Sequence, residues 1–341
     1  MRKLLGLMVF LAVLYGGLLW ALSSNQRPTG DPDLDREQFA RTVSKTNYNL
    51  MRRVGFYGIL SLGVGVLIIA GGIDLSIGSV VGLSATLLVV LLTGSHPDWL
   101  PESLQFGPVP AGLAIAIVLA AGALIGWLHG TLVAKLKLQP FIVTLCSLFI
   151  FRGLARWLTG DASLGLEDRC QDLRRLLYRE DLFGLPKFLI IFLALAAVVG
   201  VVLHLSVLGR HLFAIGSNEK AARYSGIAVD RCRILAYMGC SILAAWAGCL
   251  YLMEHNAAQP TETGSFFELY AIAGAVLGGC SLRGGDGTVL GIIIGVAIIW
   301  ILPTLTTMWG IPATLEYFVT GSALLIGAIG DELLRRRLRP V

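Results

Sequence analysis

Charge is scarce in this chain. Only 14% of its 341 residues are Asp, Glu, Lys or Arg, whereas 55% are hydrophobic, and the mean hydropathy is +0.75. Soluble domains carry about 25% charged residues, so the composition excludes an ordinary soluble protein and predicts an all-α polytopic membrane protein. A net charge of +5 would suggest nucleic-acid binding in a soluble chain, but in a membrane protein it is expected on cytoplasmic loops. We therefore expect membrane lipid and no nucleic acid among the partners.

Signatures of catalytic and metal-binding chemistry are also missing. The six cysteines and five histidines are scattered, without an HExxH pair, a zinc-ligand spacing or a disulfide framework. No GxxxxGK[ST] phosphate loop, GxGxxG fingerprint or GxSxG elbow occurs. Gly284-Gly285-Asp286-Gly287 lacks the lysine of a phosphate loop and is interpreted as a tight turn. The sequence predicts neither an enzyme nor a cofactor, so any ATP that drives the protein must be hydrolysed by another chain.

Long apolar runs dominate the rest of the sequence. The first, Leu4 to Leu22, follows a basic start and is either a membrane span or a signal peptide, since Ala21-x-Ser23 resembles a cleavage site. Both interpretations place residue 24 outside the cytoplasm. With this run we expect about ten spans. The others lie at approximately 55–72, 74–93, 110–134, 140–159, 187–208, 233–254, 266–282, 287–309 and 313–330.

A single transmembrane domain, 1–341, accounts for the whole chain. It begins with the first span or signal-like segment (1–23) and a long external segment (24–53) with some helix toward Asn47–Leu50. A membrane core (54–331) and a basic tail (332–341) follow. With the amino terminus inside, the basic clusters after residues 134, 209, 282 and 334 all fall on the cytoplasmic side. Both termini are therefore predicted to be cytoplasmic.

Glycines recur at small-xxx-small spacing. Examples are Gly122 with Gly126, and Gly287, Gly291 and Gly295. Such spacing lets helix backbones approach closely. We expect close packing within the bundle; a subunit interface is the alternative.

One acid interrupts the apolar runs. Asp74 lies in Ala70-Gly71-Gly72-Ile73-Asp74-Leu75-Ser76-Ile77-Gly78, and a charge in hydrocarbon costs roughly 2.5 to 3.5 kcal/mol on insertion scales. We expect the paired glycines to break a helix, and Asp74 and Ser76 to cap the next one beside a cavity. A cap at the membrane surface would suit the same residues, and both interpretations remain open at this point.

The connection from Gly209 to Ile227 is a second candidate. Ser217 or Asn218 can cap a short helix through Tyr224, and Gly226 can end it. A short capped helix outside a membrane bundle suits docking in a partner's groove. The alternative is an ordinary basic loop.

Several blocks, in this order, resemble permease subunits of bacterial sugar ABC importers, in the ribose, xylose and galactose branch. The resemblance covers roughly residues 47 to 330. It rests on Ile69–Gly78, Gln139–Leu145, Phe151–Ala155, Gly209–Ile227, Ala258–Pro260, Glu268–Ala273 and Gly278–Gly287.

The resemblance implies an ATP-driven importer of a monosaccharide or related small polar solute. The partners would be a cytoplasmic ABC ATPase, a periplasmic solute-binding protein and a second permease copy or paralogue, in the bacterial inner membrane. The 209–227 connection would then couple to the ATPase. We expect the substrate path to include Gly72, Asp74, Ser76, His129, Gln139, Phe141 and Thr144. We expect the coupling segment to include Gly209, Arg210, Gly216, Asn218, Glu219, Ala221, Ala222 and Gly226.

Two alternatives stay open. One is a permease for branched-chain amino acids or nucleosides in the same superfamily. The other is an ion-coupled secondary carrier, in which Asp74 would be the ion site.

Some residues depart from the family pattern. His129 stands where the family usually has Asn, and the segments 24–45 and 166–181 are longer and more charged than the family pattern. Arg152 and Arg156 lie one turn apart and are interpreted as snorkelling to the interface rather than contacting substrate.

Overall fold

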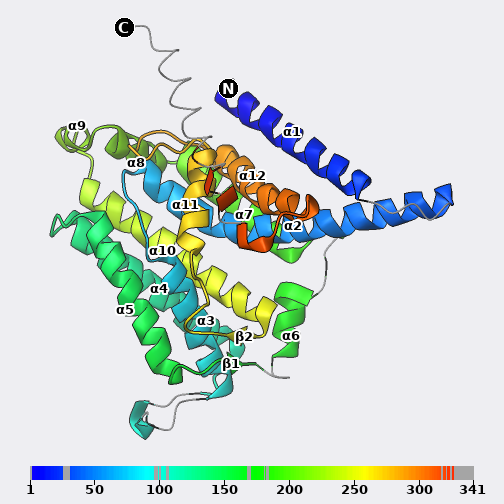
Figure 1. Cartoon of the computed structure of the whole chain (residues 1–341). Coiled ribbons are helices and arrows are strands. Elements are labelled where there is room, and N and C mark those ends of the chain that lie inside the picture. The colour runs from blue at the N-terminus through cyan, green and yellow to red at the C-terminus, as the bar shows by residue number, and fades with distance from the viewer. Residues whose placement is uncertain are drawn as a thin grey trace.

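The computed structural model describes residues 2–25, 31–95, 99, 101–104, 107–166, 170–179, 181, 184–315, 318–319, 321–322 and 325 (Figure 1). Within them the chain is a helical bundle with one two-stranded antiparallel ladder, in which Leu164 pairs with Ala258 and Gly165 with Ala257. The α-helices are α1 (Arg2–Ser24), α2 (Pro32–Ile69), α3 (Ile77–Thr93), α4 (Ala111–Ala134), α5 (Pro140–Thr159), α6 (Gln171–Arg174), α7 (Lys187–Leu205), α8 (Val207–Ser217), α9 (Glu219–Tyr224), α10 (Val229–His255), α11 (Phe267–Leu277) and α12 (Val289–Met308). The remaining elements are β1 (Leu164–Gly165), β2 (Ala257–Ala258) and the short turns η1 (Glu102–Leu104), η2 (Arg175–Arg179) and η3 (Ala313–Leu315).

The apolar helices confirm an all-α, multi-pass membrane protein. Seven helices of the described chain are long and apolar enough to cross a bilayer: α1, α2, α4, α5, α7, α10 and α12. The apolar helices α3 and α11 are shorter, because an irregular segment precedes each of them. The predicted span 313–330 falls largely, and the basic tail 332–341 entirely, outside the described residues.

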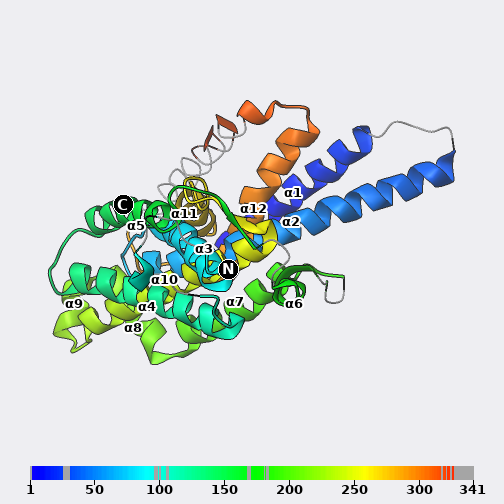
Figure 2. The ribbon, with the colours of Figure 1, turned by 90° about the horizontal axis from the view of Figure 1, so that it is seen from below.

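α2 is the central helix, and it is longer than the sequence suggested. The sequence predicts some helix only toward Asn47–Leu50 in the polar stretch before residue 54, but the helix runs unbroken from Pro32. Asp31 caps it by accepting a hydrogen bond from the Asp33 amide at 3.0 Å, and no Gly or Pro interrupts residues 33–54. This first part projects from the bundle beside α1 (Figures 1 and 2), where Phe39 and Val43 add to the apolar packing.

Glycines bring α4 and α10 into backbone contact. A Cβ added at Gly122 would lie 2.6 Å from the Cβ of Ala245, and one at Gly126 would lie 2.5 Å from the Cα of Met238. Gly291 and Gly295 of α12 likewise face the backbone at the end of α11. The expectation of close packing within the bundle is confirmed at these positions.

Gly126→Ala tests this packing. The variant is expected to lose about 1–3 kcal/mol of stability, because the added methyl group would press on backbone atoms that cannot rotate away. Thermal unfolding in detergent should show a lower Tm than for wild type. Gly153→Ala on α5, where nothing lies within 4 Å of the added Cβ, is the control. Equal Tm values for the two variants would contradict the close approach of α4 and α10.

Candidate functional site

The predicted helix break is present between α2 and α3. Ala70 is the C-cap of α2, and Gly71 takes a φ of +75°, a left-handed conformation that suits glycine at a helix end. The amides of Gly71 and Gly72 donate to the carbonyls of Ile68 and Leu67, each at 2.9 Å. Residues 70–76 therefore form an irregular segment between two buried helices.

Asp74 is enclosed by protein within this break. Its side chain is 0% exposed, so protein rather than solvent surrounds the carboxylate. Its Oδ1 accepts from the Ser76 amide at 2.8 Å and from the Ser76 hydroxyl at 2.6 Å. Ser76 stands at the N-cap position of α3 without a side-chain capping bond, because its hydroxyl is bonded to Asp74 instead. The expected cap is thus replaced by a local turn around the carboxylate.

A line of polar groups continues from Asp74 into two further helices. The Oδ2 of Asp74 lies 3.8 Å from the Nδ1 of His129 on α4, and the Nε2 of His129 lies 2.8 Å from the Ser147 hydroxyl on α5. Both His129 and Ser147 are buried. Among the described residues, neither Oδ2 of Asp74 nor Nδ1 of His129 has a hydrogen-bond partner. We call Asp74, His129 and Ser147 the polar line; it joins the helix break to α4 and α5.

Aromatic rings surround the polar line. The ring centroids of Phe151 and Tyr237 lie 5.8 and 6.3 Å from that of His129. The Tyr237 hydroxyl donates to the Ile73 carbonyl at 3.3 Å, and Gly72 leaves room beside that hydroxyl. In this conformation the polar line is closed off from solvent.

Other predicted path residues lie elsewhere. Gln139 and Phe141 are exposed, the latter by 53%, so they do not join the enclosed cluster. Thr144 is buried, one turn from Ser147, and its hydroxyl donates to the Pro140 carbonyl of its own helix at 2.9 Å. Of the seven predicted residues, the structure therefore brings Gly72, Asp74, Ser76 and His129 together.

Arg152 has a role that the sequence did not suggest. Its Nη1 donates to the carbonyls of Pro260 and Thr263, at 3.2 and 2.5 Å. It therefore holds the loop between β2 and α11 against α5, and the snorkelling interpretation is wrong for this residue. Arg156 instead pairs with Asp161 at 2.6 Å on the surface, where hydrogen bonding by Arg156 lowers the pKa of Asp161.

Glu268 brings a second carboxylate to the same region. It lies in the first turn of α11, beside Gly78 in the first turn of α3. A side chain at Gly78 would collide with it. The amino end of α3 thus has the Asp74 carboxylate before it and the Glu268 carboxylate beside it. Negative charge at this end interacts favourably with the positive end of the helix dipole.

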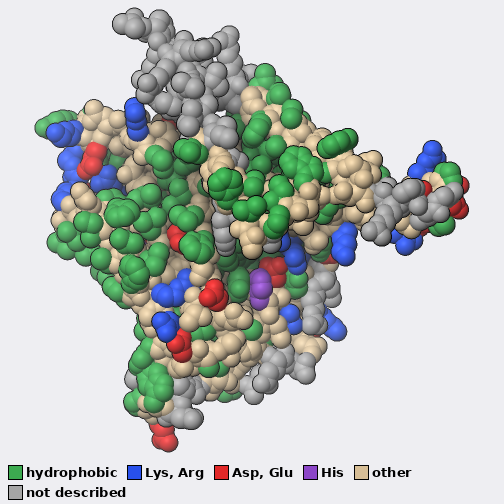
Figure 3. Space-filling view, viewed as in Figure 1, with side chains coloured by type: hydrophobic (Ala, Val, Ile, Leu, Met, Phe, Trp, Pro, Cys, Tyr) green, Lys and Arg blue, Asp and Glu red, His purple; other side chains and the backbone are tan. Residues whose placement is uncertain are grey.

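The coupling candidate consists of two helices, α8 and α9, joined at Asn218. The Asn218 side chain accepts from the Ala221 amide at 3.0 Å, so Asn218, not Ser217, caps α9. Gly226 follows α9 with a φ of +82°, and the predicted short capped helix is confirmed. Within the candidate, Arg210, Asn218, Ala221 and Gly226 are exposed, Gly209 and Ala222 are buried, and Gly216 and Glu219 are half-buried. Lys and Arg side chains gather on the surface over these helices (Figure 3).

Ion pairs fasten α9 to the bundle. Glu219 pairs with Arg233 of α10 at 2.9 Å and with Arg223 at 3.4 Å. Arg223 also pairs with Asp230 at 2.7 Å, and Asp230 with Lys137 of the α4–α5 turn at 3.1 Å. Hydrogen bonding by Arg233 lowers the pKa of Glu219, and bonding to Asp230 raises the pKa of Arg223.

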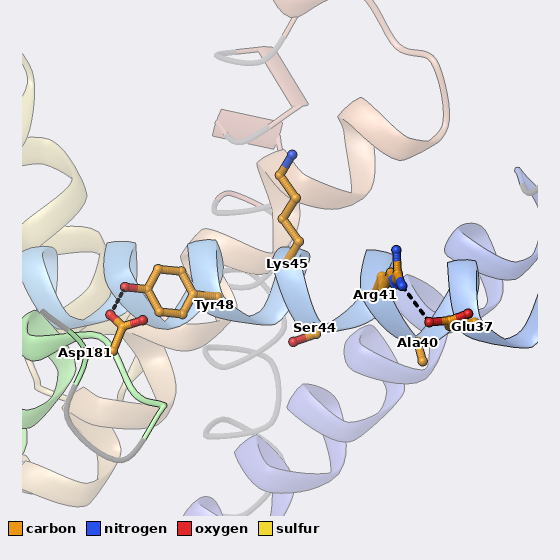
Figure 4. A pocket seen from close by; sticks show the side chains of 7 residues that line it. All are labelled: Glu37, Ala40, Arg41, Ser44, Lys45, Tyr48 and Asp181. Atoms are coloured by element: carbon orange, nitrogen blue, oxygen red, sulfur yellow. Dashed lines mark hydrogen bonds and ion pairs between the residues drawn. The ribbon is translucent and has the colours of Figure 1, made fainter. Parts of the chain in front are cut away.

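A pocket of about 560 Å³ lies on the projecting part of α2, apart from the polar line (Figure 4). The Tyr48 hydroxyl donates to Asp181, and Arg41 pairs with Glu37 at 2.5 Å. The other lining residues are Ala40, Ser44 and Lys45. Glu37 and Arg41 pair with each other, Tyr48 is bonded to Asp181, and the Lys45 side chain points away from them, so the pocket offers no convergent set of groups for a small ligand.

Comparison with known proteins identifies the family. Residues 47–328 match the family model described as branched-chain amino acid transport system / permease component. The chain belongs to this family. It is a multi-pass permease of the bacterial inner membrane, and the predicted resemblance is confirmed.

Named relatives of this permease are import proteins. It is 35% identical over 285 residues to the ribose import permease RbsC of Bacillus subtilis (strain 168), covering 83% of each chain. It is 32% identical over 297 residues to RbsC of Escherichia coli (strain K12), covering 83% of this chain and 84% of that protein. The autoinducer 2 import permease LsrD of Escherichia coli O9:H4 (strain HS) is 33% identical over 289 residues, with 82% of each chain covered. No solved structure matches the permease.

Ser147 and Tyr237 belong to the candidate site by position, and sequence reasoning missed them. The available signal for Ser147 was weak: it lies three residues after Thr144 on α5, so the two hydroxyls share a helix face. Tyr237 lies within an apolar run and gave no signal. Only the packing of α4 between α5 and α10 brings them to His129.

Substituting His129 tests the polar line. His129→Leu is expected to destabilise the permease by about 1–3 kcal/mol, because it removes the buried partner of the Ser147 hydroxyl and the ring nitrogen that faces Asp74. His129→Asn retains a polar group there and should lose much less. Thermal unfolding of both variants in detergent measures the difference. Equal losses would mean that the polar character of residue 129 is unimportant.

Proposed function

We propose that this permease forms the membrane pore of an ATP-driven importer for a monosaccharide or related small polar solute. It would work with a cytoplasmic ATPase subunit, a periplasmic solute-binding protein and a second permease copy or paralogue. The observation that carries the proposal is a buried polar line at a helix break, in a chain whose relatives are named for the import of ribose and of autoinducer 2. We also propose about ten spans, with both termini in the cytoplasm, because the basic clusters then lie inside.

The polar line supplies the chemistry for a hydroxyl-rich solute. Irregular backbone is tolerated at membrane depth where it is buried in protein or lines a path. Asp74 offers a carboxylate oxygen and His129 a ring nitrogen, neither bonded to the described protein. Both are enclosed here, so the path opens in another state of the cycle. A permease must release what it accepts, and a few polar groups among apolar walls suit that requirement.

α8 and α9 are the proposed contact with the ATPase. Closure of the ATPase on ATP would displace these helices and shift the bundle between inward-open and outward-open states. Such a shift requires that nucleotide and solute bind the two states differently. The exposed Asn218 and Ala221 mark the surface of α9 that is free for the partner.

Reconstitution tests this function. The permease is placed in proteoliposomes with its partner ATPase and solute-binding protein, and uptake of radiolabelled ribose, leucine and a nucleoside is compared. ATP-dependent uptake of the sugar is expected. Uptake that needs no ATPase and collapses with an ion gradient would overturn the proposal. ATP-dependent uptake of leucine or of the nucleoside, without uptake of ribose, would support an ATP-driven importer but overturn the sugar as its solute.

A further inference from the structure

Three backbone segments meet without side chains between them at the end of α8. They are the last residue of α2, Ile69; the end of α8, Gly216 and Ser217; and the turn Gly284–Gly285 between α11 and α12. The Gly285 amide donates to the Ile69 carbonyl at 2.8 Å. A Cβ at Gly216 would overlap that same carbonyl, and one at Gly284 would lie 2.7 Å from the Gly216 carbonyl. We call this contact the glycine junction.

Close contact with the end of α2, and not the backbone conformation, explains why residue 216 is a glycine. It lies inside α8, and its φ is outside the left-handed range that favours glycine. A glycine inside a helix costs about 1 kcal/mol relative to alanine. Glycine at this position therefore makes α8 less stable than alanine would, but it allows direct backbone contact with the end of α2.

The glycine junction lies between the two candidate functional regions. α8 leads into α9, the proposed contact with the ATPase. Ile69 immediately precedes the irregular segment that contains Asp74. Close-packed backbone transmits a displacement with little loss, since no flexible side chain can absorb it.

We propose that Gly216 is a positioning residue through which displacement of α8 and α9 moves the Ile69–Asp74 break. The inference rests on the proposed coupling role of α8 and α9. The hydrogen bond from Gly285 to Ile69 also links the turn between α11 and α12 to the end of α2. A displacement of α8 would therefore reach α2, α3 and α12 together. The glycine junction thus couples ATP hydrolysis to the polar line.

Gly216→Ala is the first test, in the complete complex with ATPase and binding protein. The added methyl group favours the helix but separates α8 from α2. We expect the complex to assemble and hydrolyse ATP, while the solute taken up per ATP falls at least about fivefold. Gly239→Ala is the matched control, because Gly239 also lies within a helix, α10, and nothing lies within 4 Å of its added Cβ. Unchanged uptake per ATP in Gly216→Ala would overturn the inference.

Hydrogen–deuterium exchange of the wild-type complex is the second test, and it does not depend on the folding of a variant. Binding of a non-hydrolysable ATP analogue is expected to change exchange in 209–227, in 69–76 and in 281–287. A change confined to 209–227 would overturn this inference and leave the coupling role intact. No change in 209–227 would contradict the coupling role itself, and with it the basis of this inference.

Discussion

Asp74→Ala is expected to reduce ATP-dependent uptake to the background measured without ATP. The carboxylate is the acceptor for two donors of Ser76 and faces the ring of His129. Alanine leaves these buried donors without a partner, at about 1–3 kcal/mol for each unsatisfied group. The break between α2 and α3 then loses both its turn and its charge.

Asp74→Asn separates these two contributions. The amide oxygen can still accept from Ser76, so the turn is retained, but the charge facing His129 is lost. If the carboxylate acts in the path, uptake should fall about tenfold, as expected when charged hydrogen bonds are replaced by neutral ones. Asp161→Asn removes a surface carboxylate paired with Arg156 and should transport normally. Normal uptake by Asp74→Asn would assign Asp74 a purely structural role.

The helix break could be predicted because its cause is local. Two adjacent glycines followed by an acid and a serine determine where α2 ends, whatever surrounds them. The cap of α9 at Asn218 was predictable for the same reason. The polar line was not, because His129 and Ser147 meet only after α4 and α5 have packed.

Two mistaken interpretations have a physical reason in common. The stretch before residue 54 has a polar composition, as a loop has, yet it contains a cap and no helix breaker, and it continues α2. Arg152 lies near the end of an apolar helix, as a snorkelling side chain does, yet the carbonyls of Pro260 and Thr263 come within reach. In both, the overall composition of the segment was a poorer guide than specific residues: a local cap and the lack of helix breakers for α2, and tertiary carbonyl acceptors for Arg152.

Glu219→Lys is expected to uncouple ATP hydrolysis from uptake. Glu219 holds α9 to α10 through Arg233 and supports Arg223 within α9. A lysine there repels both arginines and also disfavours the start of α9, where a negative charge complements the helix dipole. Ala222 is buried on the same short helix, so a shift of α9 would also disturb this apolar contact. Uptake by the complete complex should fall severalfold more than its ATP hydrolysis.

The charge-swapped double variant, Glu219→Lys with Arg233→Glu, shows whether the ion pair between α9 and α10 is what coupling requires. The swap restores an attraction between α9 and α10, so uptake should recover in part. Arg233→Glu alone should resemble Glu219→Lys. Because the pKa of Glu219 is lowered in the folded protein, the stabilisation by this pair is complete above the usual glutamate pKa of about 4.3 and is lost only as the pH falls through the lowered value. Coupling should therefore be insensitive to pH between 6 and 8 if this pair governs it. A swap that recovers nothing would mean that Glu219 contacts the ATPase directly rather than holding α9 in position.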